Sequence, residues 1–114
     1  VEEADYEPAT VEPIEGQEIA RVTLTEDAVR RIELDTSAVS GSGDDLAVPE
    51  SAIWVDANGH EWVYTSPEPL VFVRAEVTVT RYDDGTAHLS KGPAPGTDVV
   101  SVGVAELIGS EFGI

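Results

Sequence analysis

The 114-residue chain contains neither cysteine nor methionine. It therefore forms no disulfide and offers no thiolate nucleophile, and it has no cysteine pattern from which a redox compartment could be inferred. Because position 1 is valine, we expect the sequence to start after a processing or trimming point, with any targeting segment upstream of it. No apolar run approaches the ~20 residues of a membrane-spanning helix. We therefore expect membrane association only through an anchor, such as a lipid, upstream of Val1.

Basic residues are also scarce. Six Lys and Arg stand against 23 Asp and Glu, which gives a formal net charge of −17. A chain of this charge repels nucleic acid and anionic lipid at long range and favours cationic partners or counter-ions. The simplest interpretation is that the acid excess keeps the protein soluble. A dedicated cation site is the alternative.

Groups that could perform catalysis are few. His60 and His88 are the only side chains with an ordinary pKa near neutrality, and both stand in or beside expected turns and edge strands. The chain has no Gly-x-Ser-x-Gly, no His-Glu-x-x-His and no phosphate-binding glycine loop. We therefore interpret both histidines as solvated surface residues and expect no enzymatic activity, no catalytic residue, no cofactor and no metal site.

What the chain does have is a stretch rich in β-branched and aromatic residues, from Leu46 to Thr80. Within it, Ala57-Asn58-Gly59 predicts a hairpin turn, because Asn and Gly adopt positive φ at little cost. A second break is expected at Ser66–Pro69. After it, the alternation of apolar and polar residues from Val71 to Thr80 predicts a long strand with one buried face.

Two features of the hairpin leave room for a ligand. Trp54 and Trp62 flank the turn, and we favour cross-strand or core packing for them, although an exposed pair could stack on a sugar ring. Asp56–Gly59 is similar to the middle of a calcium loop, but Thr65 stands where an EF-hand needs a bidentate Glu. A ligand-binding domain, for calcium or a glycan, is therefore the competing interpretation.

The rest of the chain predicts short elements around this stretch. Thr25 is an expected N-cap, followed by acidic residues and then by a basic pair, as a helix dipole favours. The composition of 40–45 (SGSGDD) indicates a flexible connection. We expect strands over Glu18–Leu24, Leu34–Val39 and Asp98–Val104, a helix over Glu26–Ile32, a hairpin turn at Arg81–Gly85 followed by a strand through Ala87 and Leu89, a break at Gly92–Gly96, and a short turn in Ala105–Ile114 that tucks Leu107, Ile108 or Phe112 against the core.

Together these elements predict a mostly β fold: a small β-roll or barrel-like antiparallel sheet with one short α-helix. Residues 1–17 are acidic, proline-containing and free of basic residues, and we interpret them as a flexible N-terminal tether. Residues 18–114 then form a single domain, with 18–39 and 46–114 joined by the 40–45 loop.

Four segments, taken in order, are similar to the HlyD-type membrane fusion proteins, the periplasmic adaptor subunits of resistance-nodulation-division efflux systems. Val22–Val39 resembles the family's opening strand, short helix and I-x-T-x-x-V. Val48–Ile53 (VPESAI) resembles VP-x-SAV, and Gly59–Tyr64 (GHEWVY) resembles G-x-x-WVYV. Pro95–Leu107 resembles PG-D-x-VV-x-x-G-x-x-x-L. Each motif alone is unspecific, and their order and spacing carry the resemblance over most of residues 20 to 112.

The resemblance implies the family's membrane-proximal domain, a small β-roll that contacts the extracytoplasmic part of a transporter. The lipoyl, hairpin and barrel regions of the family have no counterpart here, since only 40–45 stands at their place. The chain therefore resembles a membrane-proximal domain standing alone, without the parts that reach an outer-membrane channel. The methionine and cysteine ligands of metal-exporting relatives are also missing, so metal handling does not carry over.

From these observations we expect a non-enzymatic, extracytoplasmic adaptor or interaction module, associated with the cell envelope through a periplasmic location or a lipid anchor. The expected partner is a membrane transporter or its accessory proteins. The polar residues of the long strand, Arg74, Glu76 and Thr78, are the expected exposed contacts. Free strand edges could add to such contacts by pairing with another chain.

Overall fold

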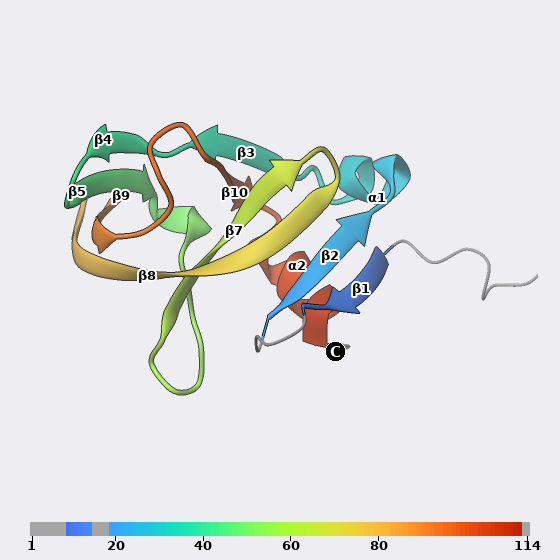
Figure 1. Ribbon diagram of the computed structural model, residues 1–114. Helices are drawn as coiled ribbons and strands as arrows, with labels where there is room; N and C mark the ends of the chain where they lie inside the picture. Colours follow the sequence, from blue (N-terminus) through green and yellow to red (C-terminus); the bar gives the residue numbers. More distant parts are fainter. Residues whose placement is uncertain (1–8, 15–18, 113–114) are drawn as a thin grey trace, which may run out of the picture.

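The computed structural model describes residues 9–14 and 19–112. These residues form an antiparallel β structure with two α-helices and one 3₁₀ turn (Figure 1). In chain order the elements are β1 (Ala9–Pro13), β2 (Ala20–Leu24), α1 (Glu26–Arg31), β3 (Asp35–Ala38), β4 (Ser40–Ser42), β5 (Asp45–Pro49), the 3₁₀ turn η2 (Glu50–Ala52), β6 (Trp54–Val55), β7 (Glu61–Glu68), β8 (Val71–Asp83), β9 (Thr86–Lys91), β10 (Asp98–Val102) and α2 (Val104–Phe112).

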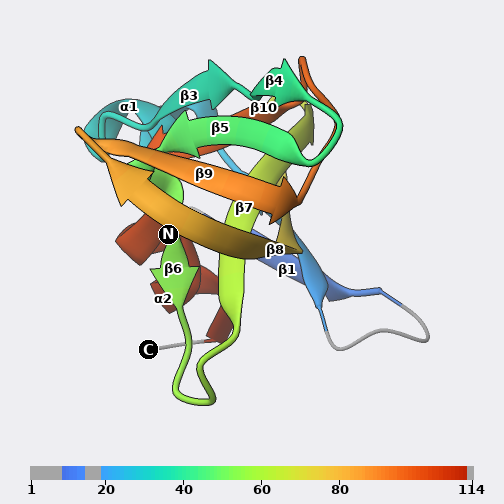
Figure 2. The same ribbon diagram turned by 90° about the vertical axis from the view of Figure 1, so that its left-hand side faces the viewer.

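The main sheet nearly closes into a barrel. Its strands run in the order β3-β10-β7-β8-β9-β5-β4, so the two ends of the sheet are strands that follow each other in the chain. Only Val39 separates them, and its N–H and C=O bond to Thr97 and Gly96. Residues 35–42 therefore pair with β10 through their first half and with β5 through their second half, which brings the sheet edges together (Figure 2). The predicted mostly β, barrel-like fold is confirmed.

The apolar side chains form two cores, because successive residues of a strand point to opposite faces. Val63 belongs to the core inside the barrel and its neighbour Tyr64 to a second core outside it; Val99 and Val100 divide in the same way. The outer core lies where β2 and both helices contribute apolar residues next to β7, β8 and β10. Sheet residues on this side are thus covered on both faces.

Strand β8 connects the two parts of the molecule. It pairs along one edge with β7, and its other edge takes β2 at its start and β9 at its end. The predicted strand Val71–Thr80 is confirmed and continues to Asp83, where Asp84 and Gly85, both at positive φ, form the predicted hairpin turn. In Figure 1 this strand curves along most of the length of the molecule.

The first helix forms as its sequence predicts. α1 begins after Thr25, whose Oγ1 accepts a hydrogen bond from the N–H of Ala28 at 3.0 Å. Asp27 in the first turn forms ion pairs with Arg30 and Arg31 in the last turn. The helix ends at Arg31 with Ile32 as its C-cap, one residue before the predicted end.

The 40–45 segment is a tight hairpin, so the prediction of a flexible connection is wrong. Ser40 pairs with Ala47 and Ser42 with Asp45 across β4 and β5. Gly41 lies at φ +94°, and a Cβ at this position would sit 2.2 Å from the carbonyl oxygen of Asp45. The glycine is therefore needed for a close backbone approach within a sheet.

Both ends of the described chain also differ from expectation. Within the predicted tether, Ala9–Pro13 is a strand, so the prediction of a flexible segment is wrong there. The strand pairs with β2 over five residues, and its backbone hydrogen bonds extend the sheet. Of residues 1–17, only 9–14 belong to the described part of the chain. The expected C-terminal turn is the helix α2, which buries Leu107 completely. Burial of this apolar face outweighs the low helix propensity of Gly109. Neither described helix has the length and hydropathy of a membrane-spanning segment.

Candidate functional site

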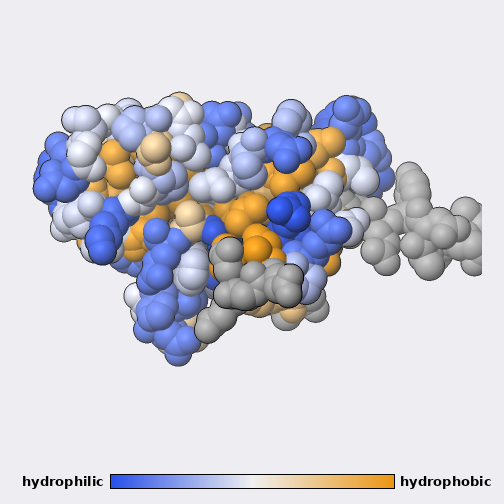
Figure 3. Space-filling model, viewed as in Figure 1, coloured by the Kyte–Doolittle hydropathy of each residue, from blue (hydrophilic) through white to orange (hydrophobic). Residues whose placement is uncertain are grey.

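A cavity of about 450 Å³ lies on the outer face of the sheet, between the β6–β7 hairpin and the C-terminal half of α2. Its walls are aromatic and apolar side chains, its floor is Arg74, and its rim is the hairpin loop. The loop projects from the body of the protein in Figures 1 and 2, and its surface is hydrophilic next to a band of apolar side chains in Figure 3. The lining residues are Trp54, Asp56, Ala57, Asn58, His60, Trp62, Arg74, Ile108 and Phe112.

The floor of the cavity rests on a buried ion pair between β8 and α2. Arg74 donates from Nε to Oε1 of Glu111 at 2.9 Å and from Nη2 to Oε2 at 3.0 Å. The two side chains are only 6% and 3% exposed. The hydroxyl of Tyr64 donates a third hydrogen bond to Oε1 of Glu111 at 2.7 Å. Burial, reinforced by this contact with Glu111, raises the pKa of the Tyr64 hydroxyl far above its ordinary value.

Three aromatic rings surround the Arg74 guanidinium. Its central carbon lies 4.3 Å from the ring centroid of Trp62, 5.0 Å from that of Phe112 and 5.7 Å from that of Trp54. All three distances fall within the range of cation–π attraction. Glu111 neutralises the charge of Arg74, so the floor of the cavity carries no net charge. The two hydrogen bonds to Glu111 and the surrounding rings hold the guanidinium in place.

Asp56 builds the loop at the rim of the cavity. Its Oδ1 accepts the backbone N–H groups of Asn58 and His60, both at 2.9 Å, and its Oδ2 accepts the indole N–H of Trp62 at 3.0 Å. The hydrogen bond from Trp62 is the main cause that lowers the pKa of Asp56, partly opposed by burial. The carboxylate is ionised at neutral pH. Its hydrogen bonds to the backbone stabilise the turn, and its hydrogen bond to the indole fixes the orientation of the Trp62 ring.

The predicted hairpin and tryptophan pairing are confirmed. Trp54 stands directly opposite Trp62 in the β6–β7 ladder, and Gly59 in the turn has φ +86°. The structure adds that this pair lines a cavity, with the Trp54 ring 5.7 Å from that of Phe112 and tilted by 54°. The tryptophans are thus both cross-strand partners and walls of a site.

The three predicted contact residues fall in different surroundings. Arg74 is buried, so its predicted exposure is wrong: α2 covers this half of β8, and the sequence pattern did not reveal that helix. Glu76 and Thr78 are exposed as predicted. Glu76 lies beside the cavity rim, with its Oε2 3.7 Å from Nδ1 of His60. Whether these residues contact a partner stays a prediction.

The two histidines lie on different elements. His60 is in the β6–β7 loop, and its side chain is 56% exposed, as expected of a solvated residue. His88 is on β9 with a side chain only 19% exposed, and its Nδ1 lies 3.6 Å from Oδ1 of Asp45. The prediction of a solvated histidine is therefore wrong for His88, because the sheet partly covers it. Within residues 9–14 and 19–112, no three His, Asp or Glu side chains gather as metal ligands would.

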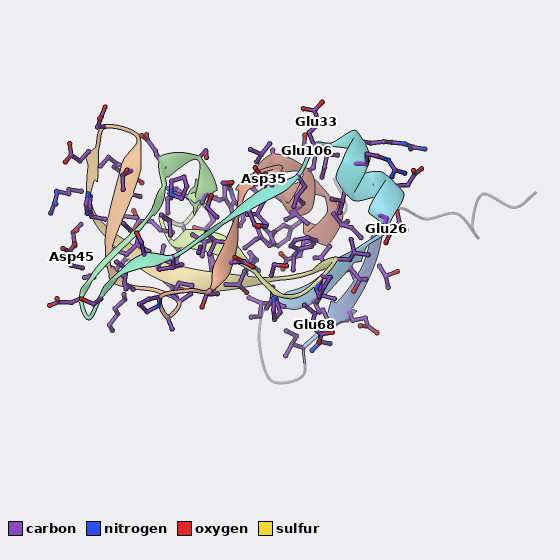
Figure 4. All side chains as sticks on the ribbon, turned by 90° about the horizontal axis from the view of Figure 1, so that it is seen from above. Glu26, Glu33, Asp35, Asp45, Glu68 and Glu106 are labelled. Atoms are coloured by element: carbon purple, nitrogen blue, oxygen red, sulfur yellow. The ribbon has the colours of Figure 1, made fainter. Side chains whose placement is uncertain are left out.

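Exposed carboxylates lie on several elements of the described chain. Figure 4 labels six of them. Asp45 lies at the β4–β5 hairpin, at one end of the protein, and Glu68 is the last residue of β7. The others lie towards α1, at the opposite end from Asp45: Glu26, Glu33, Asp35 and Glu106. Their distribution agrees with a general role in solubility. The net charge of −17 also favours the approach of cations at long range.

Sequence reasoning missed Tyr64, Glu111 and Phe112 as parts of the site. Tyr64 reads as an ordinary strand residue, and the other two stand in a segment whose glycines suggested a turn. The pair of tryptophans around a turn was the one visible signal. Comparisons with protein-family models, with curated proteins and with solved structures each find no match to this chain.

Proposed function

We propose that this chain is a non-enzymatic interaction module of the cell envelope, an adaptor domain that contacts a membrane transporter or its accessory proteins from the extracytoplasmic side. The resemblance of its four segments to the membrane-proximal domain of membrane fusion proteins is one support. The structural support is the aromatic cavity, a concave surface whose floor and rim are held in place before any partner arrives. Such preorganisation lowers the entropic cost of binding.

Reaction chemistry has less support. The two histidines occupy different elements, and Asp56 and Glu111 are engaged in hydrogen bonds that build the structure. Glu76 and Thr78 are exposed on β8, where a partner can reach them. These side chains, together with the nearby cavity, make the outer face of β7 and β8 the proposed contact surface.

Site-specific photocrosslinking in living cells tests this function. A photoreactive residue replaces Glu76 or Thr78 in turn, and the adducts are isolated from membranes and identified by mass spectrometry. Glu26, an exposed residue in the first turn of α1 and at the opposite end of the molecule from Asp45 in Figure 4, is the control position. We expect adducts with an integral membrane transport protein from Glu76 and Thr78 but not from Glu26. Adducts with soluble proteins only, or the same adducts from all three positions, would contradict the proposal.

One observation favours a second candidate, an acidic ligand-binding domain. Trp54 and Trp62 line a cavity whose volume lies in the usual range of small-molecule sites, as a stacked sugar ring would need. The test is a thermal melt with neutral oligosaccharides, with calcium and with a chelator. A ligand that binds the folded state raises the Tm, whereas an unchanged Tm in every mixture would remove this candidate.

A further inference from the structure

We infer that the cavity accepts the cationic side chain of a basic residue, an arginine or lysine, presented by the partner protein. This inference rests on the proposed function, since it names the chemistry of the contact that an adaptor would make. Three properties of the cavity carry it: the nature of its walls, the charge of its rim and floor, and the group that the same rings already bind.

The walls suit a cation. Trp54 and Phe112 stand 5.7 Å apart with their ring planes tilted by 54°, and Phe112 is 48% exposed. The face of an aromatic ring carries negative electrostatic potential, so a cation on the open side of this ring pair is attracted by both rings. Apolar contact from Ile108 would cover the aliphatic stem of the entering side chain.

The charge of the site agrees with this choice. Glu111 balances Arg74 through two hydrogen bonds, so the floor repels a cation less than a bare guanidinium would. Asp56 at the rim is ionised at neutral pH, as an ordinary aspartate is, and the hydrogen bond from the Trp62 indole lowers its pKa further. Glu76 lies just outside the rim beside His60, and the chain as a whole carries a net charge of −17. An anionic ligand would meet repulsion from Asp56, from Glu76 and from the net charge of the chain.

The protein itself shows that these rings hold a guanidinium. Arg74 lies within 5.7 Å of three ring centroids and keeps its bidentate bond to Glu111. The proposed guest would occupy the outer part of the same aromatic cluster, where the negative charge of Asp56 attracts it across a short distance. The contact would fix the register of a partner segment, while the acidic surface around it would raise the rate of encounter.

Intrinsic fluorescence measures the binding directly, because the only two tryptophans of the chain, Trp54 and Trp62, both line the cavity. The probe is the pentapeptide Gly-Gly-Arg-Gly-Gly with blocked termini. Its matched control replaces arginine with citrulline, which keeps the shape and removes the charge. We expect a saturable change in emission with the arginine peptide and with its lysine analogue, and at least a ten-fold weaker response with citrulline.

Two pairs of variants separate the cavity from general attraction to an acidic surface. Asp56→Asn and Asp44→Asn each remove one charge, so non-specific attraction predicts equal effects, whereas the cavity predicts weakening only for Asp56→Asn. Phe112→Leu keeps an apolar wall without a π face and should weaken binding about two- to five-fold. Tyr82→Leu, which alters an exposed aromatic elsewhere on β8, should change nothing. A thermal melt of each variant checks that it is folded.

Equal binding of the arginine and citrulline peptides would overturn the inference, as would binding unaffected by both cavity variants. Saturable binding of a neutral oligosaccharide without response to the arginine peptide would also overturn it and favour the glycan candidate. The peptide assay uses the purified chain and crosslinking uses the cell, so the two proposals fail separately. Transporter adducts from Glu76 without arginine binding would leave the adaptor function standing and refute only the cationic guest.

Discussion

Glu111→Gln is the perturbation that tests most sharply how the site is held together. In the native protein both carboxylate oxygens of Glu111 bond to Arg74, and the pair is almost completely buried. The amide of glutamine has nearly the same shape but no charge, and it presents an NH₂ group to one donor of Arg74. The variant therefore leaves a buried guanidinium without its counter-charge, for which removal of one partner typically costs about 3–5 kcal/mol.

Because glutamine keeps one acceptor oxygen, which can still serve Tyr64, we expect the lower end of this range, about 3 kcal/mol of unfolding free energy. Urea unfolding followed by tryptophan fluorescence measures it. At this chain length the same loss lowers the Tm by roughly 10 °C. The matched control is Glu106→Gln, the same substitution at an exposed position of the same helix, which should change the free energy by less than about 0.5 kcal/mol.

The double variant Arg74→Met with Glu111→Leu gives an independent check of the physical reason. Replacing both members of a buried ion pair by apolar residues removes the desolvation penalty together with the attraction. We therefore expect the double variant to be more stable than Glu111→Gln alone. If Glu111→Gln and Glu106→Gln were equally mild, the reasoning that the ion pair fastens α2 to the sheet would be refuted.

Three further predictions follow from the same structure. Gly41→Ala would place a Cβ 2.2 Å from the Asp45 carbonyl oxygen at φ +94°, so we expect a loss of at least about 2 kcal/mol in urea unfolding, and an unchanged midpoint would contradict the hairpin geometry. The raised pKa of Tyr64 keeps its proton in the folded state while the unfolded state loses it near pH 10. Stability therefore falls as pH rises above about 10, and this fall should shrink in Tyr64→Phe; equal slopes would refute the assignment. The lowered pKa of Asp56 has the opposite consequence, because the stability that it contributes is lost as the pH falls through its folded-state pKa. We expect an emission change of Trp62 below about pH 4 that Asp56→Asn abolishes, and an acid transition that persists in the variant would count against the hydrogen bond.

The parts of the fold that could be predicted are those specified by neighbouring residues. Thr25 with its acidic first turn predicts α1 within one residue, and Asp84-Gly85 predicts the β8–β9 hairpin. The turn at Gly59 likewise follows from local chemistry, since Asn and Gly tolerate positive φ. In each case the residues that form the element also supply its hydrogen bonds, so the sequence alone contains the information.

The parts that could not be predicted depend on distant contacts. α2 forms because Leu107 enters a core built by β2, β7 and β10, which outweighs the glycine in its centre. The same helix buries Arg74, a residue that strand alternation alone assigns to the solvent. The β4–β5 hairpin, which contains Gly41, was missed for a different reason. A composition rich in glycine and serine occurs both in flexible linkers and in strands whose backbones approach closely, so composition alone does not distinguish the two.

The candidate site follows the same division. Trp54 and Trp62 were visible because both flank a recognisable turn, and their pairing could be predicted from the register of a hairpin. Phe112 and Glu111 reach the cavity only through the docking of α2, with Glu111 37 residues away from Arg74 in sequence. A cavity that joins a local hairpin to a distant helix appears only when the tertiary structure is known.

The most direct measurement of the adaptor role places the photoreactive residue at Asn58, on the rim of the cavity, in cells that express the chain. We predict that the adduct maps to a segment of an integral membrane transport protein containing Arg or Lys, and that the yield falls when Phe112 is also changed to Leu. An adduct without a membrane protein, or a yield that is indifferent to Phe112, would contradict the account.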